Sequence, residues 1–267
     1  MKFVYIICLL FSSIMFSQSK AIVPKQGAIV FKKVDTITDV EKYKKSMVKL
    51  TSKMIDAQMK NIIERELVEN QMQLNTDSTQ INEMKQVMKN MIEESVMQDI
   101  DNKAIDNKDI KYHQLFKNQL VVKFQTLNDV IFENYNVINI QKNTSKTLES
   151  DSITIVSENI EYQYSKNEVL EIKEFKNETK KINGFKCFKV IMLFKPYYNE
   201  EDEFENFINQ YVHKRELWVT DKIKCSYHPI ENQKEIITKY YPLEITESIV
   251  GIEGQLVNFS IVSLSIN

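Results

Sequence analysis

After about residue 119, apolar and polar residues alternate, and a turn rich in Asn or charged residues follows about every ten residues. Alternation with a period of two predicts β-strands. A further short run of branched and aromatic residues predicts a strand near the start of the chain. The expected strands are Ala28–Val34, Gln119–Gln125, Val130–Tyr135, Ser152–Ser157, Ile160–Ser165, Val169–Phe175, Phe185–Phe194, Arg215–Thr220, Tyr241–Ile249 and Leu256–Leu264. Regular short strands without helix-length gaps predict an antiparallel sheet.

Between the first strand and the others, the period changes to that of a helix. Apolar residues recur at helical spacing over about 39–102, and a polar turn at 75–79 interrupts them. Thr38 and Glu41 have the spacing of a capping box at the start of this segment. Two helices joined by so short a turn are expected to fold back on each other as an amphipathic αα-hairpin.

The fold class predicted from these patterns is α+β. We expect a curved antiparallel sheet, with a half-barrel as one form of it, and the αα-hairpin inserted at about 39–102. About 250 residues remain after the leader described next, which is enough for a single domain covering 20–267.

The first 19 residues read as a secretory signal peptide. Lys2 precedes an apolar run, Phe3–Phe16, and small or polar residues follow it. The chain is therefore expected to be exported, to the periplasm, to the outer membrane or out of the cell. No later run approaches the length of a transmembrane helix. The net charge of −2 does not favour nucleic acid as a partner.

Export makes a disulfide between Cys187 and Cys225 a candidate, because an oxidising compartment favours such bonds. The alternative is two buried free thiols. The three histidines, His113, His213 and His228, do not have the spacing of a metal site, and no cofactor motif is found. A hydrolase would have to use carboxylates, for which the candidates are Glu171, Glu174, Glu244 and Glu247.

The C-terminal half resembles the GLPGLI family, which consists of secreted proteins found mainly in Bacteroidota. The segment 181–190 (KINGFKCFKV) is similar to that family's Lys-x-Ile-x-Gly-aromatic-x-Cys segment, and 216–223 (ELWVTDKI) is similar to its Trp-containing strand. The run that names the family is replaced by 241–245 (YPLEI). The resemblance implies a cell-envelope protein with a curved antiparallel sheet, similar in outline to periplasmic lipoprotein carriers, and it implies no catalytic residues.

The functional hypothesis is therefore an envelope protein without enzymatic activity, which binds a hydrophobic ligand or an envelope protein. Eight of the 11 methionines lie between residues 47 and 97, and methionine-rich surfaces adapt to varied partners. The candidate surface residues are Trp218, Met84, Met88 and Met91. Ordinary core packing is the alternative for all four. A carboxylate hydrolase and assembly through the helices are the alternative functions.

Overall fold

The computed structural model describes residues 21–53, 56, 78–105, 108–151, 154–197 and 211–267. The expected signal peptide lies outside these residues. None of the helices that the structure describes combines the length and the apolar character needed to cross a membrane.

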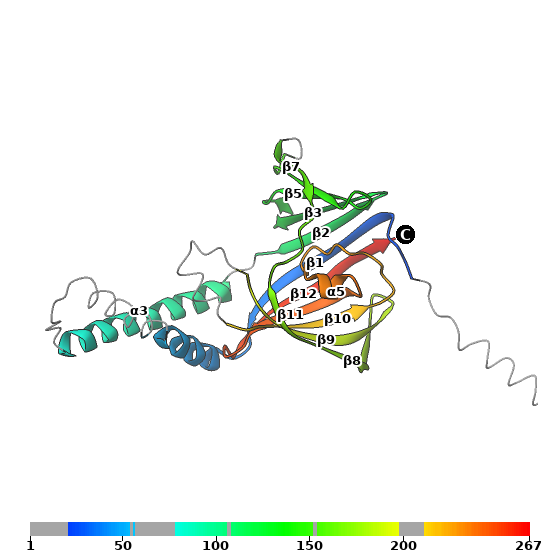
Figure 1. Ribbon diagram of the computed structural model, residues 1–267. Coiled ribbons are helices and arrows are strands. Elements are labelled where there is room, and N and C mark those ends of the chain that lie inside the picture. The colour runs from blue at the N-terminus through cyan, green and yellow to red at the C-terminus, as the bar shows by residue number, and fades with distance from the viewer. Residues whose placement is uncertain (1–20, 54–55, 57–77, 106–107, 152–153, 198–210) are drawn as a thin grey trace, which may run out of the picture.

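The described strands form one large sheet in which all neighbouring strands run antiparallel (Figure 1), so the predicted antiparallel sheet is confirmed. The strands are β1 (Gln26–Ile37), β2 (Ile110–Lys117), β3 (Leu120–Leu127), β4 (Val130–Ile131), β5 (Tyr135–Asn139), β6 (Thr144–Leu148), β7 (Ile155–Glu161), β8 (Glu168–Ile182), β9 (Phe185–Lys195), β10 (His213–Thr220), β11 (Tyr241–Ile249) and β12 (Gln255–Ile266). Their order is β7-β6-β5-β3-β2-β1-β12-β11-β10-β9-β8, and β4 pairs with β3.

The first and last strands pair with each other in the middle of the sheet. β1 lies between β2 and β12, and its register runs from Gly27 opposite Ile266 to Ile37 opposite Gln255. Gly27 has a φ of +116°, and a Cβ at this position would lie 1.9 Å from the carbonyl oxygen of Ser265. Only glycine allows the two strands to approach so closely here.

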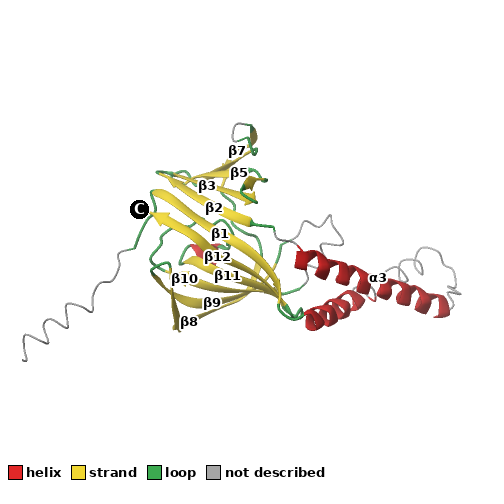
Figure 2. Cartoon of the chain, turned by 180° about the vertical axis from the view of Figure 1, so that it is seen from behind, coloured by secondary structure: helices red, strands yellow, loops and turns green. Residues whose placement is uncertain are grey.

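Two helical segments, residues 40–53 and α3 (Ser78–Ile105), lie between β1 and β2 in the chain. We call them the helical arm. Figures 1 and 2 show the arm extending away from the end of the sheet and not over either of its faces. At its base, Tyr43, Val96 and Ile100 are buried and pack with Ile37 and Ile252.

The arm begins at Asp39 and not at the predicted capping box. The Asp39 carboxylate accepts a hydrogen bond from the backbone N–H of Lys42 at 3.0 Å. This is the contact that an N-cap residue makes with the third residue of a helix. The backbone N–H of Thr38 instead donates to the carbonyl of Gly254 at 2.7 Å, so the assignment of Thr38 as the cap is corrected by one residue.

One face of the sheet is covered by the segment that connects β10 to β11, residues 221–240, which we call the strap. It contains the short helix α5 (Lys234–Ile237), which lies in front of the sheet in Figure 1 and behind it in Figure 2. Ile236 and Ile237 are buried in one cluster with Leu217 and Val219 of β10. Nearer the start of the strap, the Tyr227 carbonyl accepts a hydrogen bond from the Gln114 side chain of β2 at 2.8 Å. The strap face is thus filled by the chain itself.

The predicted disulfide is not formed: Cys187 and Cys225 are both free thiols. The Cys225 thiol donates to the Tyr227 carbonyl at 3.1 Å, and the Cys187 thiol lies 3.7 Å from the Phe185 carbonyl. Burial raises the pKa of each thiol to about 11. Cys187 is buried and Cys225 is half-buried, so the disulfide prediction is wrong and the two residues are free thiols that pack as small apolar side chains.

Candidate functional site

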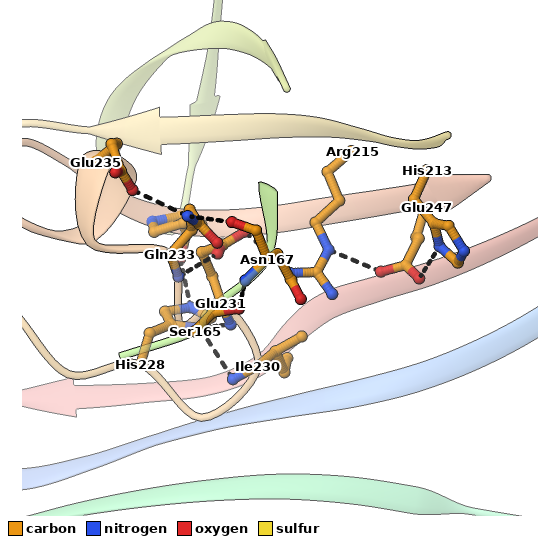
Figure 3. Close-up of polar contacts among 11 residues, drawn as sticks. Ser165, Asn167, His213, Arg215, His228, Ile230, Glu231, Gln233, Glu235 and Glu247 are labelled. Carbon is orange, nitrogen blue, oxygen red and sulfur yellow. Dashed lines mark hydrogen bonds and ion pairs between the residues drawn. The ribbon is translucent and has the colours of Figure 1, made fainter. Parts of the chain in front are cut away.

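The guanidinium of Arg215, on β10, forms ion pairs with two carboxylates beneath the strap. Its Nη1 lies 3.2 Å from Glu231 Oε2 of the strap, and its Nε donates to Glu247 Oε2 of β11 at 2.7 Å (Figure 3). The Glu231 side chain is completely buried. His213 Nδ1 lies 3.5 Å from the second oxygen of Glu247. Two carboxylates therefore share one guanidinium, and the strap is joined to the sheet through this network.

The pKa values of Glu247 and Arg215 are both shifted in the direction that favours the charged form. Burial alone would raise the pKa of Glu247, but the contact with His213 and the charge and hydrogen bond of Arg215 outweigh it and lower the pKa to about 2. Burial acts to lower the pKa of Arg215, whereas the two carboxylates raise it, and the net direction is upward. Glu231 also accepts the backbone N–H of Gln233 at 2.7 Å. These contacts fix the strap's course across the sheet.

His228 organises the turn of the strap next to this network. Its Nδ1 accepts hydrogen bonds from the backbone N–H groups of Ile230, at 3.1 Å, and Glu231, at 2.9 Å. Because Nδ1 accepts, the hydrogen of the neutral ring is on Nε2, which donates to the Pro242 carbonyl at 3.1 Å. The ring is fully buried, and this burial lowers its pKa to about 3. His228 is therefore neutral and structural.

This buried imidazole predicts a loss of stability in mild acid. An unfolded histidine has a pKa near 6.5, so below that pH the unfolded chain binds a proton that the folded chain refuses. The stabilisation is complete above the unfolded pKa and declines as the pH falls. Between pH 7 and pH 5 we expect the free energy of unfolding to fall by about 2 kcal/mol from this group, measured by urea denaturation.

The matched variant for this prediction is His228→Gln, whose amide offers one acceptor and one donor but does not titrate. Its free energy of unfolding is expected to change less between pH 7 and pH 5 than that of the wild type. Glu247 contributes in a separate window, because its stabilisation is lost below its unfolded pKa as the pH falls towards about 2. Equal pH dependence of the two proteins would contradict the role assigned to His228.

Lys123 of β3 is a second polar group under the strap. Its Nζ donates to the Tyr162 hydroxyl at 3.3 Å and to the His228 carbonyl at 3.4 Å. Burial lowers its pKa to about 8. The Tyr162 hydroxyl also lies 2.7 Å from Asn232 Oδ1 of the strap, to which it donates a hydrogen bond. Polar groups thus hold the strap on both sides of His228.

The four carboxylates considered for a hydrolase do not form one site. Each carboxylate is paired with a different cation: Glu171 with Lys173, Glu174 with Lys176, Glu244 with Lys180 and Glu247 with Arg215. Glu244 and Glu247 are three residues apart on β11, so their side chains point to opposite faces of the sheet. The structure does not bring these carboxylates together.

Trp218 alternates with Leu217 and Val219 on β10, and those two are the fully buried residues that pack under the strap. Trp218 itself is half-buried, and the Lys180 ammonium lies 4.3 Å from the centroid of its ring. Trp218 therefore lies on the face of β10 opposite that of Leu217 and Val219. The three candidate methionines, Met84, Met88 and Met91, all belong to α3. The structure describes the side chain only of Met91, which is 64% exposed.

Sequence reasoning missed the residues that hold the strap, namely Arg215, Glu231, His228 and Lys123. A signal for Arg215 is present in the predicted strand, because it occupies the same face as Leu217 and Val219. A charged residue in line with core positions requires a buried partner. Nothing in the sequence identifies Glu231 as that partner, because it lies in a segment without periodicity.

The comparisons assign this chain to no family. No family model and no curated protein matches the chain. Among solved structures, the crystal structure of LprF from Mycobacterium bovis is similar over 60% of this chain and 79% of that chain, with 9% sequence identity and a TM-score of 0.22. A similarity at this level carries no conclusion about function.

Proposed function

We propose that this chain is an exported cell-envelope protein of the GLPGLI type that acts by binding, without catalysis, and that the helical arm carries its binding surface for an envelope protein. In this proposal the arm is an insertion into a half-barrel-like sheet domain. The observation that carries it is the position of the arm, which extends from the sheet with apolar side chains in the solvent.

The two most exposed apolar residues that the structure describes on α3 are neighbours on one side of the helix. Val87 and Met91 are 58% and 64% exposed, and their spacing of four residues places them next to each other. The opposite side of α3 carries Val96 and Ile100, which are buried at the base of the arm. An arm that is anchored by one side and exposes apolar side chains on the other is suited to contact a second protein.

The strap argues against the strap face of the sheet as the main binding surface. The strap fills this face with Ile236, Ile237 and the network around Arg215. A hydrophobic ligand on that face would have to displace these contacts, including a completely buried carboxylate. The partner-binding form of the hypothesis requires no such rearrangement.

Site-specific photocrosslinking in intact cells tests this proposal. We expect a photoreactive residue in place of Val87 or Met91 to form an adduct with another envelope protein. The control position is Lys89, which is exposed on the opposite side of the same helix. Mass spectrometry of the adduct then identifies what was bound.

The outcomes separate the alternatives. An adduct between two copies of this chain supports helix-mediated assembly, and light scattering of the purified protein checks it. A lipid adduct, together with lipid recovered by solvent extraction, supports the hydrophobic ligand. Equal crosslinking from Lys89 and Met91, or none from either, contradicts an arm that presents one specific surface.

A further inference from the structure

A cleft of about 610 Å³ opens where both ends of the strap meet the hairpin of β8 and β9. Asp221 and Lys222 come from the start of the strap and Tyr240 from its end, and the rest of the lining includes Lys176, Lys186 and Phe188. Small-molecule sites typically have volumes of about 300–1,000 Å³. The cleft is therefore large enough for an organic ligand, and it is separate from the network around Arg215.

Three lysines from three elements line this cleft. Lys176 Nζ is 3.0 Å from Glu174 Oε2, and Lys222 Nζ is 3.7 Å from Asp221 Oδ1. Lys186 has no carboxylate oxygen within 4.0 Å among the described residues. Lys176 and Lys222 are thus each paired with one carboxylate, whereas Lys186 is not. The lining carries three ammonium groups and one carboxylate, that of Asp221, and this excess of positive charge favours the binding of an anion.

The cleft also has an aromatic wall. The rings of Phe188 and Tyr240 meet edge to face, with centroids 5.0 Å apart. The Tyr240 hydroxyl donates to Glu174 Oε1 at 2.8 Å, which holds this ring in place. An apolar or aromatic group of a ligand can pack against such a wall while its charged end reaches the lysines.

We propose that this cleft binds an organic phosphate. The phosphate dianion lies between the ammonium groups of Lys186 and Lys222, and the apolar part of the ligand lies against Phe188 and Tyr240. Lysine binds phosphate as a compact point charge, and two lysines balance a dianion. The phosphate belongs either to a free small molecule or to a lipid headgroup. The site does not depend on the function proposed for the arm.

Isothermal titration calorimetry with 1-naphthyl phosphate tests the proposal. We expect it to bind the full-length mature protein at least tenfold more tightly than inorganic phosphate, which lacks the ring, or 1-naphthol, which lacks the charge. The affinity is expected to fall as salt rises, because ions screen the lysines. Flotation with vesicles of phosphatidylglycerol, compared with phosphatidylcholine, determines whether the phosphate belongs to a lipid headgroup.

Single substitutions locate the site. Lys186→Ala and Lys222→Ala are each expected to weaken binding of 1-naphthyl phosphate about tenfold, as for loss of a charged hydrogen bond. Lys195→Ala removes an equal charge from the far end of the same hairpin, outside the lining, and is expected to change the affinity less than twofold. Thermal unfolding confirms that the variants are folded. Absence of binding at millimolar ligand, or equal weakening by Lys195→Ala, overturns the proposal.

Discussion

Replacing Arg215 with methionine is expected to lower the free energy of unfolding by about 3–5 kcal/mol, because the substitution leaves Glu231 as an unpaired buried charge. Glu247 loses its 2.7 Å contact in the same variant. Folded proteins have total free energies of unfolding of about 5–15 kcal/mol, so this one substitution removes a large part of the stability. Urea denaturation at pH 7 measures it as a lower midpoint.

Two companion variants make this prediction specific. Lys214→Met alters the neighbouring residue, which points to the opposite face of β10, and is expected to change stability by no more than about 0.5 kcal/mol. Adding Glu231→Gln to Arg215→Met removes the unpaired charge and is expected to recover much of the loss. If Arg215→Met alone costs less than about 1 kcal/mol, the strap is not held by this ion pair.

Replacing Gly254 with alanine is expected to destabilise the junction between the sheet and the arm by about 3–5 kcal/mol. Gly254 has a φ of +82°, and a Cβ there would lie 2.2 Å from the Asp39 carbonyl oxygen and 2.8 Å from the Tyr43 nitrogen. Both neighbours are backbone atoms at the start of the arm. They cannot yield without disturbing the cap of the first helix or the β11–β12 turn.

Gly251 is the control for this prediction. Its φ of +96° is equally unfavourable for alanine, but a Cβ there meets nothing within 4 Å. Gly251→Ala is therefore expected to cost only the conformational strain, about 1–2 kcal/mol. The difference between the two variants in urea denaturation measures the close approach itself. Equal losses would show that the contact with Asp39 has no energetic role.

The sheet was predictable from the sequence wherever one face of a strand is uniformly apolar. β9 follows this rule, since Val190, Met192 and Phe194 occupy every second position and all three are buried. β2 escaped prediction because its buried face carries Gln114 between apolar residues, which obscures the period of two. That glutamine is buried because it bonds to the strap and to the Tyr241 hydroxyl.

The strap could not be predicted from pattern at all. Its buried residues face the sheet one at a time as the chain crosses several strands, so burial follows neither a helical nor a strand period. His228 and Glu231 are polar and are placed inside only by contacts with residues far away in the chain. The cysteines show the same limit of sequence patterns. Their even number predicted a disulfide, but the tertiary contacts place each thiol near a backbone carbonyl and leave both thiols free.

The pairing of β1 with β12 has a consequence for biogenesis. β1 cannot form its hydrogen bonds with β12 until residues 255–266 have been synthesised, more than 200 residues after β1 itself. Contacts between the extremes of a chain make folding slow, because the intervening loop must be closed first. Removing β12 would leave the facing edges of β1 and β11 without a hydrogen-bonding partner.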